Sequence, residues 1–369
     1  MNSIVYDSDD LQVIYAPGTS DYLLITFSAL NDVVDGQSFW GKRFVESNGI
    51  ATIGIVARKV HGWPTDEIEA TIKAAAPILS RYDEIITFGT SMGAYGALKH
   101  SRRLGARIAI AFAPFYGAHP SDIGQAESRR LGYLEADMRG GDAIGAEDLC
   151  ARAIVFYDPY FVEENKHAAL IRQVSPAIHM IPAPNTQHFP VALFAKSEVR
   201  LALIAFARAG SIENICELTR AQRKLSPVRV TAIVEKIAET DPKFARHLLK
   251  EYSGRLFSQQ SSFAGDQGYA EFKKAVPKFA LRISDVARRV GELDLAVTCA
   301  QVAVTLLPES PAGYERLIMG MIEADRVEEA RAIVAQAAAA GLDVSTLEPL
   351  LAMPKGGWPI AVATPATLF

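Results

Sequence analysis

The sequence is poor in cysteine, in long hydrophobic runs and in excess charge, and each shortage excludes a class of protein. Its three cysteines, Cys150, Cys216 and Cys299, are scattered over 369 residues, which argues against a disulfide framework and against a zinc site. No apolar run approaches the roughly 20 residues that cross a bilayer. The first residues, MNSIVYDSDD, lack the basic start and apolar core of a signal peptide. We therefore expect a cytoplasmic protein with no transmembrane segment.

The charge balance and the absence of certain motifs narrow the possible partners further. A net charge of −4 at pH 7 gives no electrostatic reason to expect nucleic acid or an anionic membrane as a partner. The sequence has no phosphate-binding loop and no clustered metal-ligand spacing, so it predicts neither a cofactor nor a metal. Hydrophobic residues make up 49% of the chain, as in ordinary globular proteins, and the length allows two domains of about 100 to 200 residues.

Residues 1–209 alternate short apolar segments with longer amphipathic ones. Strands are expected at 11–17, 22–29, 50–57, 84–89, 107–114, 152–158 and 177–183. The central segments are apolar on both faces, as buried parallel strands must be. Residues 65–82 between two of them place apolar side chains at helical spacing. This alternation predicts an α/β domain with a doubly wound, mostly parallel sheet and helices on both faces.

Residues 210–353 contain no strand-like segment and are predicted to form an all-helical domain. Helices are expected at 212–224, 227–239, 242–252 and 271–289, with more beyond. Small residues then recur at the spacing of the second helix of a tetratricopeptide repeat: Ala296, Ala300, Ala303 and Pro308, followed 34 residues after Ala296 by Ala330. Residues 277–342 therefore resemble two tetratricopeptide units, although Ile318 stands where that family usually has glycine. An alanine-rich helical hairpin without repeat ancestry is the alternative.

The resemblance to tetratricopeptide repeats also bears on partners. Such helices usually bind proteins or mediate assembly, so the resemblance implies a protein partner and allows a homo-oligomer. The last segment, residues 354–369, is apolar and contains three prolines, Pro354, Pro359 and Pro365. We expect this tail to pack against the protein or a partner.

The segment Gly89-Thr90-Ser91-Met92-Gly93 fits the pattern G-x-S-x-G. It follows an expected strand directly and opens an expected helix, which is the context of a nucleophile elbow. In such a turn the serine backbone is strained, and the residues two before and two after it must be tiny. Ser91 is therefore the candidate nucleophile.

With this elbow, residues 10–208 resemble the α/β-hydrolase family, which orders its triad serine, acid, histidine. The resemblance implies an acid at the end of the strand two after the elbow strand, where Asp158 stands, and a histidine after the last strand, where His188 stands. Glu163 or Glu164 is left open as the alternative acid. His179 competes with His188 but lies inside an expected strand.

The resemblance also implies an oxyanion hole and a pocket. The backbone N–H of Met92 is one expected oxyanion donor, and the second is expected from Ser28 or Ala29, since the sequence there is FSALND rather than HGGG. His61 and Trp63 follow a strand at the same sheet edge as the elbow and are candidate substrate-binding residues.

A Ser-His-Asp triad predicts a serine hydrolase, because histidine must take the serine proton and return it to the leaving group. The predicted substrate is a small-molecule or glycan-linked acyl ester, cleaved in an esterase or deacylase reaction. Peptidase, thioesterase and acyltransferase chemistry stay open on the same fold. The alternative is a catalytically silent hydrolase fold, acting as an adaptor in bacterial surface polysaccharide or secretion assembly.

Overall fold

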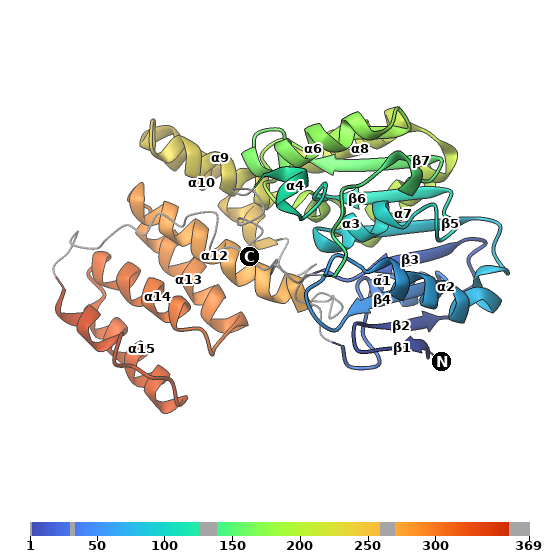
Figure 1. Ribbon diagram of the computed structural model, residues 1–369. Helices are drawn as coiled ribbons and strands as arrows, with labels where there is room; N and C mark the ends of the chain where they lie inside the picture. Colours follow the sequence, from blue (N-terminus) through green and yellow to red (C-terminus); the bar gives the residue numbers. More distant parts are fainter. Residues whose placement is uncertain (1, 30–33, 125–138, 259–269, 354–369) are drawn as a thin grey trace. The chain divides into compact units, whose positions relative to one another are not determined.

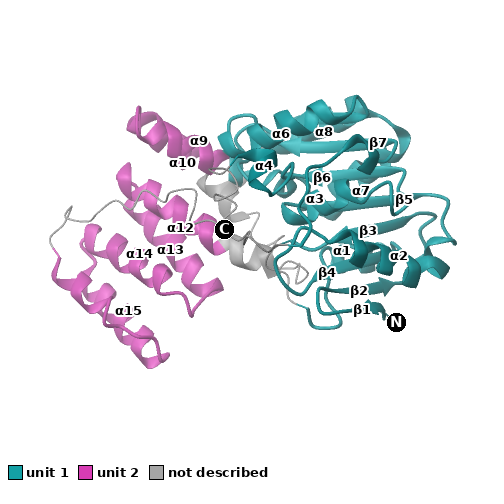
Figure 2. Ribbon diagram, viewed as in Figure 1, with its two compact units in different colours: residues 1–229, 265–269 teal, residues 230–264, 270–369 magenta. Residues whose placement is uncertain are grey.

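The computed structural model describes residues 2–29, 34–124, 139–258 and 270–353. The expected apolar tail, 354–369, lies outside these residues. The chain divides into two compact units, residues 1–229 with 265–269, and residues 230–264 with 270–369 (Figure 2). This division falls later than residue 209, because α8 (Ile212–Leu225) places Ile215 in a core on one face of the sheet.

The first unit contains an eight-stranded sheet in the order β1-β2-β4-β3-β5-β6-β7-β8 (Figure 1). β1 pairs antiparallel with β2 and β2 antiparallel with β4, and the other neighbours pair in parallel. The strands are β1 Ser3–Asp7, β2 Leu11–Ala16, β3 Leu23–Phe27, β4 Thr52–Ala57, β5 Ile85–Thr90, β6 Ile108–Phe112, β7 Arg152–Tyr157 and β8 Ile178–Pro182. The predicted mostly parallel sheet is confirmed. The sequence analysis missed only β1, whose residues are mostly exposed.

Helices cover both faces of this sheet. They are α1 Lys42–Ser47, α2 Thr65–Leu79, α3 Met92–Lys99, α4 Pro120–Ile123, α6 Val162–Val174, α7 Ser197–Ala209 and α8, with short 3₁₀ helices η1 Ala146–Asp148 and η2 Pro190–Phe194. Alternate strand residues belong to two separate cores: Leu23 and Ile25 pack on the side of α2 and α3, whereas Leu24 packs on the side of α1 and α7. Strands that are buried on both faces explain the continuous apolar runs.

The parallel strands bring their carboxyl ends to one edge of the sheet, which is where open α/β sheets place their ligands. Ser28, Ser91 and Asp158 each follow the last residue of a strand directly, and His188 lies in the connection after β8. The sheet therefore brings these residues to one edge, although Ser28 and His188 are more than a hundred residues apart in the sequence.

The second unit is helical, as predicted. Its described helices are α9 Pro227–Ala238, α10 Pro242–Ser258, α12 Ala270–Arg289, α13 Leu293–Leu306, α14 Pro311–Glu323 and α15 Val327–Ala339, followed by the 3₁₀ helix η3 Glu348–Ala352. Ala296, Ala300 and Ala303 are fully or almost fully buried on α13. A Cβ atom on Gly313 or Gly320 of α14 would press against a valine of α13, so small residues do allow these helices to approach closely. The tetratricopeptide ancestry itself stays a prediction.

None of the described helices is both long enough and apolar enough to cross a membrane.

Candidate active site

Ser91 stands in a sharp turn between β5 and α3. Its backbone has φ 53° and ψ −122°, a conformation that residues with a side chain rarely adopt. Such strain costs about 1 to 3 kcal/mol and is concentrated at functional sites. The turn is fixed on both sides, because the Ser91 N–H donates to the Phe112 carbonyl of β6 at 2.9 Å and its own carbonyl accepts from Ala94 at 3.0 Å. Ser91 therefore has the strand-turn-helix setting expected of a nucleophile elbow.

The two glycines of the motif are required by close backbone contacts. A Cβ atom on Gly89 would overlap the carbonyl oxygen of Gly93, and one on Gly93 would overlap the carbonyl oxygens of Phe27 and Ser28. All of these neighbours are backbone atoms, which cannot rotate away. The motif is thus a packing requirement of the turn as well as a sequence signature.

We predict that Gly93→Ala destabilises the protein by at least about 2 kcal/mol, because the added methyl group must displace the end of β3. Urea denaturation followed by circular dichroism measures the loss. Gly41→Ala is the control: no atom of the described residues lies within 4 Å of its added Cβ, so only the strain of a left-handed backbone, φ 81° and ψ 6°, is introduced. An equal effect of the two substitutions would contradict the packing argument.

His188 reaches Ser91 from the loop after β8. Its Nε2 lies 2.9 Å from Ser91 Oγ, a hydrogen-bond distance, and its side chain is 20% exposed. The loop that carries it is tightly wound, since Asn185 and Gln187 both have positive φ and Thr186 Oγ1 donates to the Ala183 carbonyl at 2.6 Å. The structure therefore brings together the predicted serine and the predicted histidine.

The hydrogen bond at Nδ1, the other ring nitrogen of His188, goes to a different carboxylate from the predicted Asp158. His188 Nδ1 lies 2.6 Å from Oε1 of Glu164, one of the two glutamates left open by the sequence. Glu164 sits in the first turn of α6, and this turn folds back over the end of β7, so that the Asp158 N–H donates to Glu164 Oε2 at 3.3 Å. The hydrogen-bonded chain in the structure is therefore Ser91–His188–Glu164, in place of the predicted Ser91–His188–Asp158.

Glu164 is a buried carboxyl, 6% exposed. Burial raises its pKa above the ordinary value, and the hydrogen bond and charge of His188 act in the opposite direction. A carboxylate in this setting favours an Nδ1–H on the imidazole. That tautomer leaves Nε2 free to accept a proton from Ser91.

The expected oxyanion donors are only partly supported by the structure. Met92 is the first residue of α3, so its N–H has no partner within the helix and lies at the positive end of the helix dipole. Ser28, in contrast, donates its N–H to the Ile55 carbonyl at 2.9 Å and is fully buried. Pairing with β4 thus removes Ser28 as a donor. The alternative donor, Ala29, stays a prediction.

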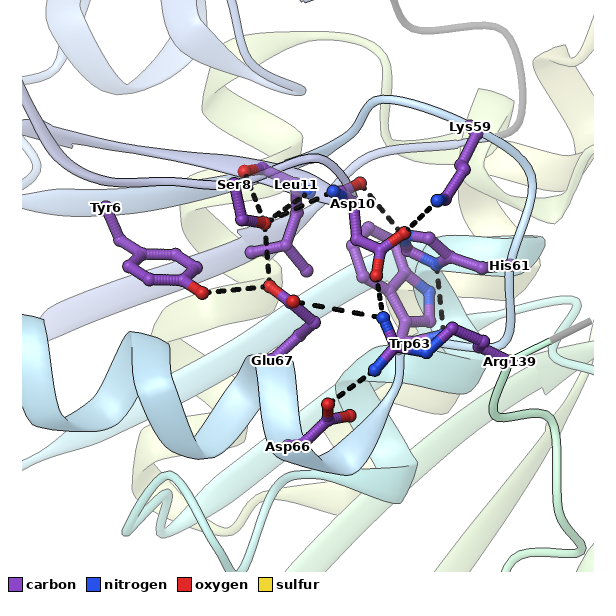
Figure 3. Close-up of polar contacts among 10 residues, drawn as sticks. All are labelled: Tyr6, Ser8, Asp10, Leu11, Lys59, His61, Trp63, Asp66, Glu67 and Arg139. Atoms are coloured by element: carbon purple, nitrogen blue, oxygen red, sulfur yellow. Dashed lines mark hydrogen bonds and ion pairs between the residues drawn. The ribbon is translucent and has the colours of Figure 1, made fainter.

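His61 and Trp63 are buried, at 2% and 1% exposure, and their polar atoms bond within the protein (Figure 3). His61 Nε2 lies 3.0 Å from the Asp10 carbonyl, and the Trp63 N–H donates to His61 Nδ1 at 3.1 Å. The Trp63 indole N–H donates to the Met92 carbonyl at 2.8 Å. Through these bonds the two residues support the elbow. Their predicted part in substrate binding stays a prediction.

A group of charged residues continues this support toward the surface (Figure 3). The buried Asp10 forms ion pairs with Lys59 and Arg139. Arg139 also pairs with Asp66 at the start of α2. Burial alone would raise the pKa of Asp10, but the two cations together lower it. These pairs tie Arg139 to the turn before β2 and to the start of α2. The Gly62 N–H also donates to the Arg139 carbonyl at 2.9 Å, which ties Arg139 to the loop that carries His61.

We predict that Trp63→Phe lowers stability by about 1 kcal/mol, because the Met92 carbonyl loses a buried donor, and that it also slows reaction at Ser91. Trp40→Phe is the matched control. It trims another buried indole, whose N–H has no hydrogen-bond partner among the described residues. Urea denaturation and the rate of ester hydrolysis are measured for both. Equal kinetic losses would contradict a specific role for Trp63 under the elbow.

The described residues contain no group of three or more histidine, cysteine, aspartate or glutamate side chains placed to hold a metal ion.

No family model and no curated protein sequence matches the chain. Solved structures resemble about half of it at low identity. Est1E from Butyrivibrio proteoclasticus is 13% identical with a TM-score of 0.36, over 57% of this chain and 97% of that one. XC6422 from Xanthomonas campestris, described as a serine hydrolase without a lid, is 17% identical with a TM-score of 0.30, over 48% and 80%. The capsule O-acetyltransferase of Neisseria meningitidis serogroup A is 11% identical with a TM-score of 0.35, over 48% and 86%.

Likenesses at these identities and TM-scores do not define an activity. The fold class is defined by the molecule itself: the strand order, the antiparallel second strand and the strained serine after β5 are those of the α/β-hydrolase fold. The predicted fold is confirmed.

Proposed function

We propose that the protein is a serine hydrolase that cleaves acyl esters at Ser91. The observation that carries the proposal is the unbroken hydrogen-bonded chain from Ser91 Oγ through His188 to the buried Glu164, at 2.9 Å and 2.6 Å. Its serine end stands in a strained turn at the carboxyl edge of the sheet. A serine, a base within hydrogen-bond reach and a third group that orients the base form the arrangement of an activated nucleophile.

The proposed reaction begins with proton transfer from Ser91 Oγ to His188 Nε2 as Oγ attacks the acyl carbonyl carbon. The Met92 N–H, at the start of α3, donates to the oxygen that becomes negative. The tetrahedral intermediate collapses, and His188 gives its proton to the departing alcohol. Water then attacks the acyl carbon while His188 takes a proton from it. The second intermediate collapses, His188 returns this proton to Ser91 Oγ, and the carboxylic acid is released.

Glu164 supports this cycle through His188. Its carboxylate accepts the Nδ1–H at 2.6 Å, which fixes the tautomer and stabilises the imidazolium that forms in each step. The substrate class we propose is a small-molecule or glycan-linked acyl ester. The helical unit is proposed to bind a protein partner or a second copy of the chain, as stacked helix pairs commonly do.

The experiment that tests this function is hydrolysis of p-nitrophenyl acetate, butyrate and octanoate by the purified full-length chain, with a matching thioester series. Release of p-nitrophenol by the wild type and its loss in Ser91→Ala support the proposal. Absence of turnover with every ester and thioester, by a protein whose circular dichroism shows the native fold, would favour the silent adaptor instead.

A further inference from the structure

We infer that Asp158 is a positioning residue, which holds the main chain of the histidine loop, whereas Glu164 is the carboxylate that bonds to the histidine ring. The inference rests on the proposed function for its kinetic test. It gives separate tasks to two buried carboxylates that lie six residues apart in the sequence.

Both carboxylate oxygens of Asp158 accept backbone hydrogen bonds. Oδ1 accepts the Tyr160 N–H at 2.9 Å, and Oδ2 accepts the Gln187 N–H at 2.7 Å. The residue is only 1% exposed, so water competes little for these oxygens. Hydrogen bonds to an ionised carboxylate are about twice as strong as neutral ones, which makes Asp158 a firm anchor for the residue just before His188.

The anchored residue, Gln187, has a strained backbone. Gln187 has φ 51° and Asn185 has φ 62°, a left-handed conformation that costs about 1 kcal/mol or more for each residue with a side chain. Strained backbone of this kind persists only where the surroundings fix it. The Gln187 N–H bond to Asp158 is a long-range contact that fixes it, because it ties the loop after β8 to the end of β7.

Asp158 and Glu164 are also tied to each other. The Asp158 N–H donates to Glu164 Oε2 at 3.3 Å, and Glu164 Oε1 meets His188 Nδ1. One segment, residues 158–164, thus grips the histidine loop at two points: Asp158 at the backbone of residue 187 and Glu164 at the ring of residue 188. The geometry of His188 toward Ser91 depends on both contacts: the bond from Asp158 is to the backbone of Gln187, and the bond from Glu164 is to the imidazole.

Two substitutions at Asp158 distinguish the loss of its hydrogen bond to the Gln187 N–H from the loss of its negative charge. Asp158→Ala removes both acceptors, and we expect kcat for p-nitrophenyl acetate to fall about 100-fold with little change in KM, as for a misplacement of about 1 Å. Asp158→Asn keeps a carbonyl oxygen that can face the Gln187 N–H, so it is expected to recover activity to within about tenfold of the wild type. Glu164→Gln, which changes the group at the ring, is expected to lose about ten-thousand-fold. Asp83→Asn, at an exposed position, is the control for the same chemical change elsewhere.

Hydrogen–deuterium exchange supplies a readout that does not depend on activity. The Gln187 amide is expected to exchange about tenfold or more faster in Asp158→Ala, and close to the wild-type rate in Asp158→Asn. Asp158→Asn losing as much activity as Glu164→Gln would overturn the inference, because the charge itself would then be needed. Unchanged exchange in Asp158→Ala would overturn it as well. A wild type without esterase activity would contradict the proposed function, and the exchange result would still decide for or against the anchor. If Asp158→Ala does not fold, Asp158→Asn decides by the same activity and exchange criteria.

Discussion

Ser91→Ala is expected to lower kcat for ester hydrolysis about a millionfold, to the level at which only substrate binding and the oxyanion donors assist the reaction. The reason is that Ser91 Oγ lies 2.9 Å from His188 Nε2, the base that must take its proton. The measurement is the initial rate with p-nitrophenyl acetate at saturating substrate. A variant that keeps more than about a thousandth of the rate would show that another group does the chemistry.

Ser91→Gly is expected to be just as inactive, and it adds a test of strain. At ordinary positions glycine is less stable than alanine. At φ 53° the order should reverse, since this conformation is strained for alanine and not for glycine. We expect Ser91→Gly to be more stable than Ser91→Ala by about 1 kcal/mol in urea denaturation. The opposite order would contradict a strained elbow.

Glu164→Gln carries the second large effect, a fall in kcat of about ten-thousand-fold. If the amide nitrogen faces His188, the ring must accept at Nδ1 and carry its proton on Nε2, where it cannot take the proton of Ser91. The measurement is kcat and KM with the same ester. Glu163→Gln, at the neighbouring position in the same helical turn, is the control. A larger loss in Glu163→Gln than in Glu164→Gln would contradict the assignment of the acid.

The same variant has an expected dependence of stability on pH. Burial raises the pKa of Glu164 above the ordinary 4.5, so the folded state binds this proton more tightly than the unfolded state does. A raised carboxyl pKa costs stability once the pH passes the unfolded-state value, and the cost levels off above the folded-state pKa. The stability of Glu164→Gln relative to wild type should therefore be greater at pH 8 than at pH 4. An equal or smaller difference at pH 8 would mean that the pKa is not raised.

The fold and the strained turn at Ser91 could be predicted because their signals are local. Strands buried on both faces must be continuously apolar, and the Ser91 turn admits only tiny residues at 89 and 93, where a Cβ atom would overlap backbone. His188 followed from its place after the last strand. These features depend on a few neighbouring residues, and a sequence displays them directly.

The acid and the supporting residues could not be predicted in the same way. Asp158 stands at the end of β7, as the family pattern expects, but the path of the chain between 158 and 164 decides which carboxylate reaches the imidazole. That path depends on where α6 begins, which is at Val162. An acidic residue in the first turn of a helix just after the strand is the signal that points to Glu163 or Glu164, and only the structure distinguishes the two.

Backbone pairing and burial explain the other differences. Ser28 is the first residue after β3, and only the register with β4 shows that its N–H already bonds to Ile55. His61 and Trp63 do lie at the predicted edge of the sheet, but their side chains turn inward, to Asp10 and Met92. Sequence position places a residue at an edge and does not show whether its side chain faces solvent.

The most direct test of an activated serine is intact-mass spectrometry after exposure to a fluorophosphonate, on the wild type and on Ser91→Ala. The site predicts a single adduct on the wild type and none on the variant, because only a serine assisted by a base reacts with this probe at neutral pH. A folded wild type that gains no adduct, or a variant that gains the same adduct, would contradict the proposal that Ser91 is the nucleophile of a serine hydrolase.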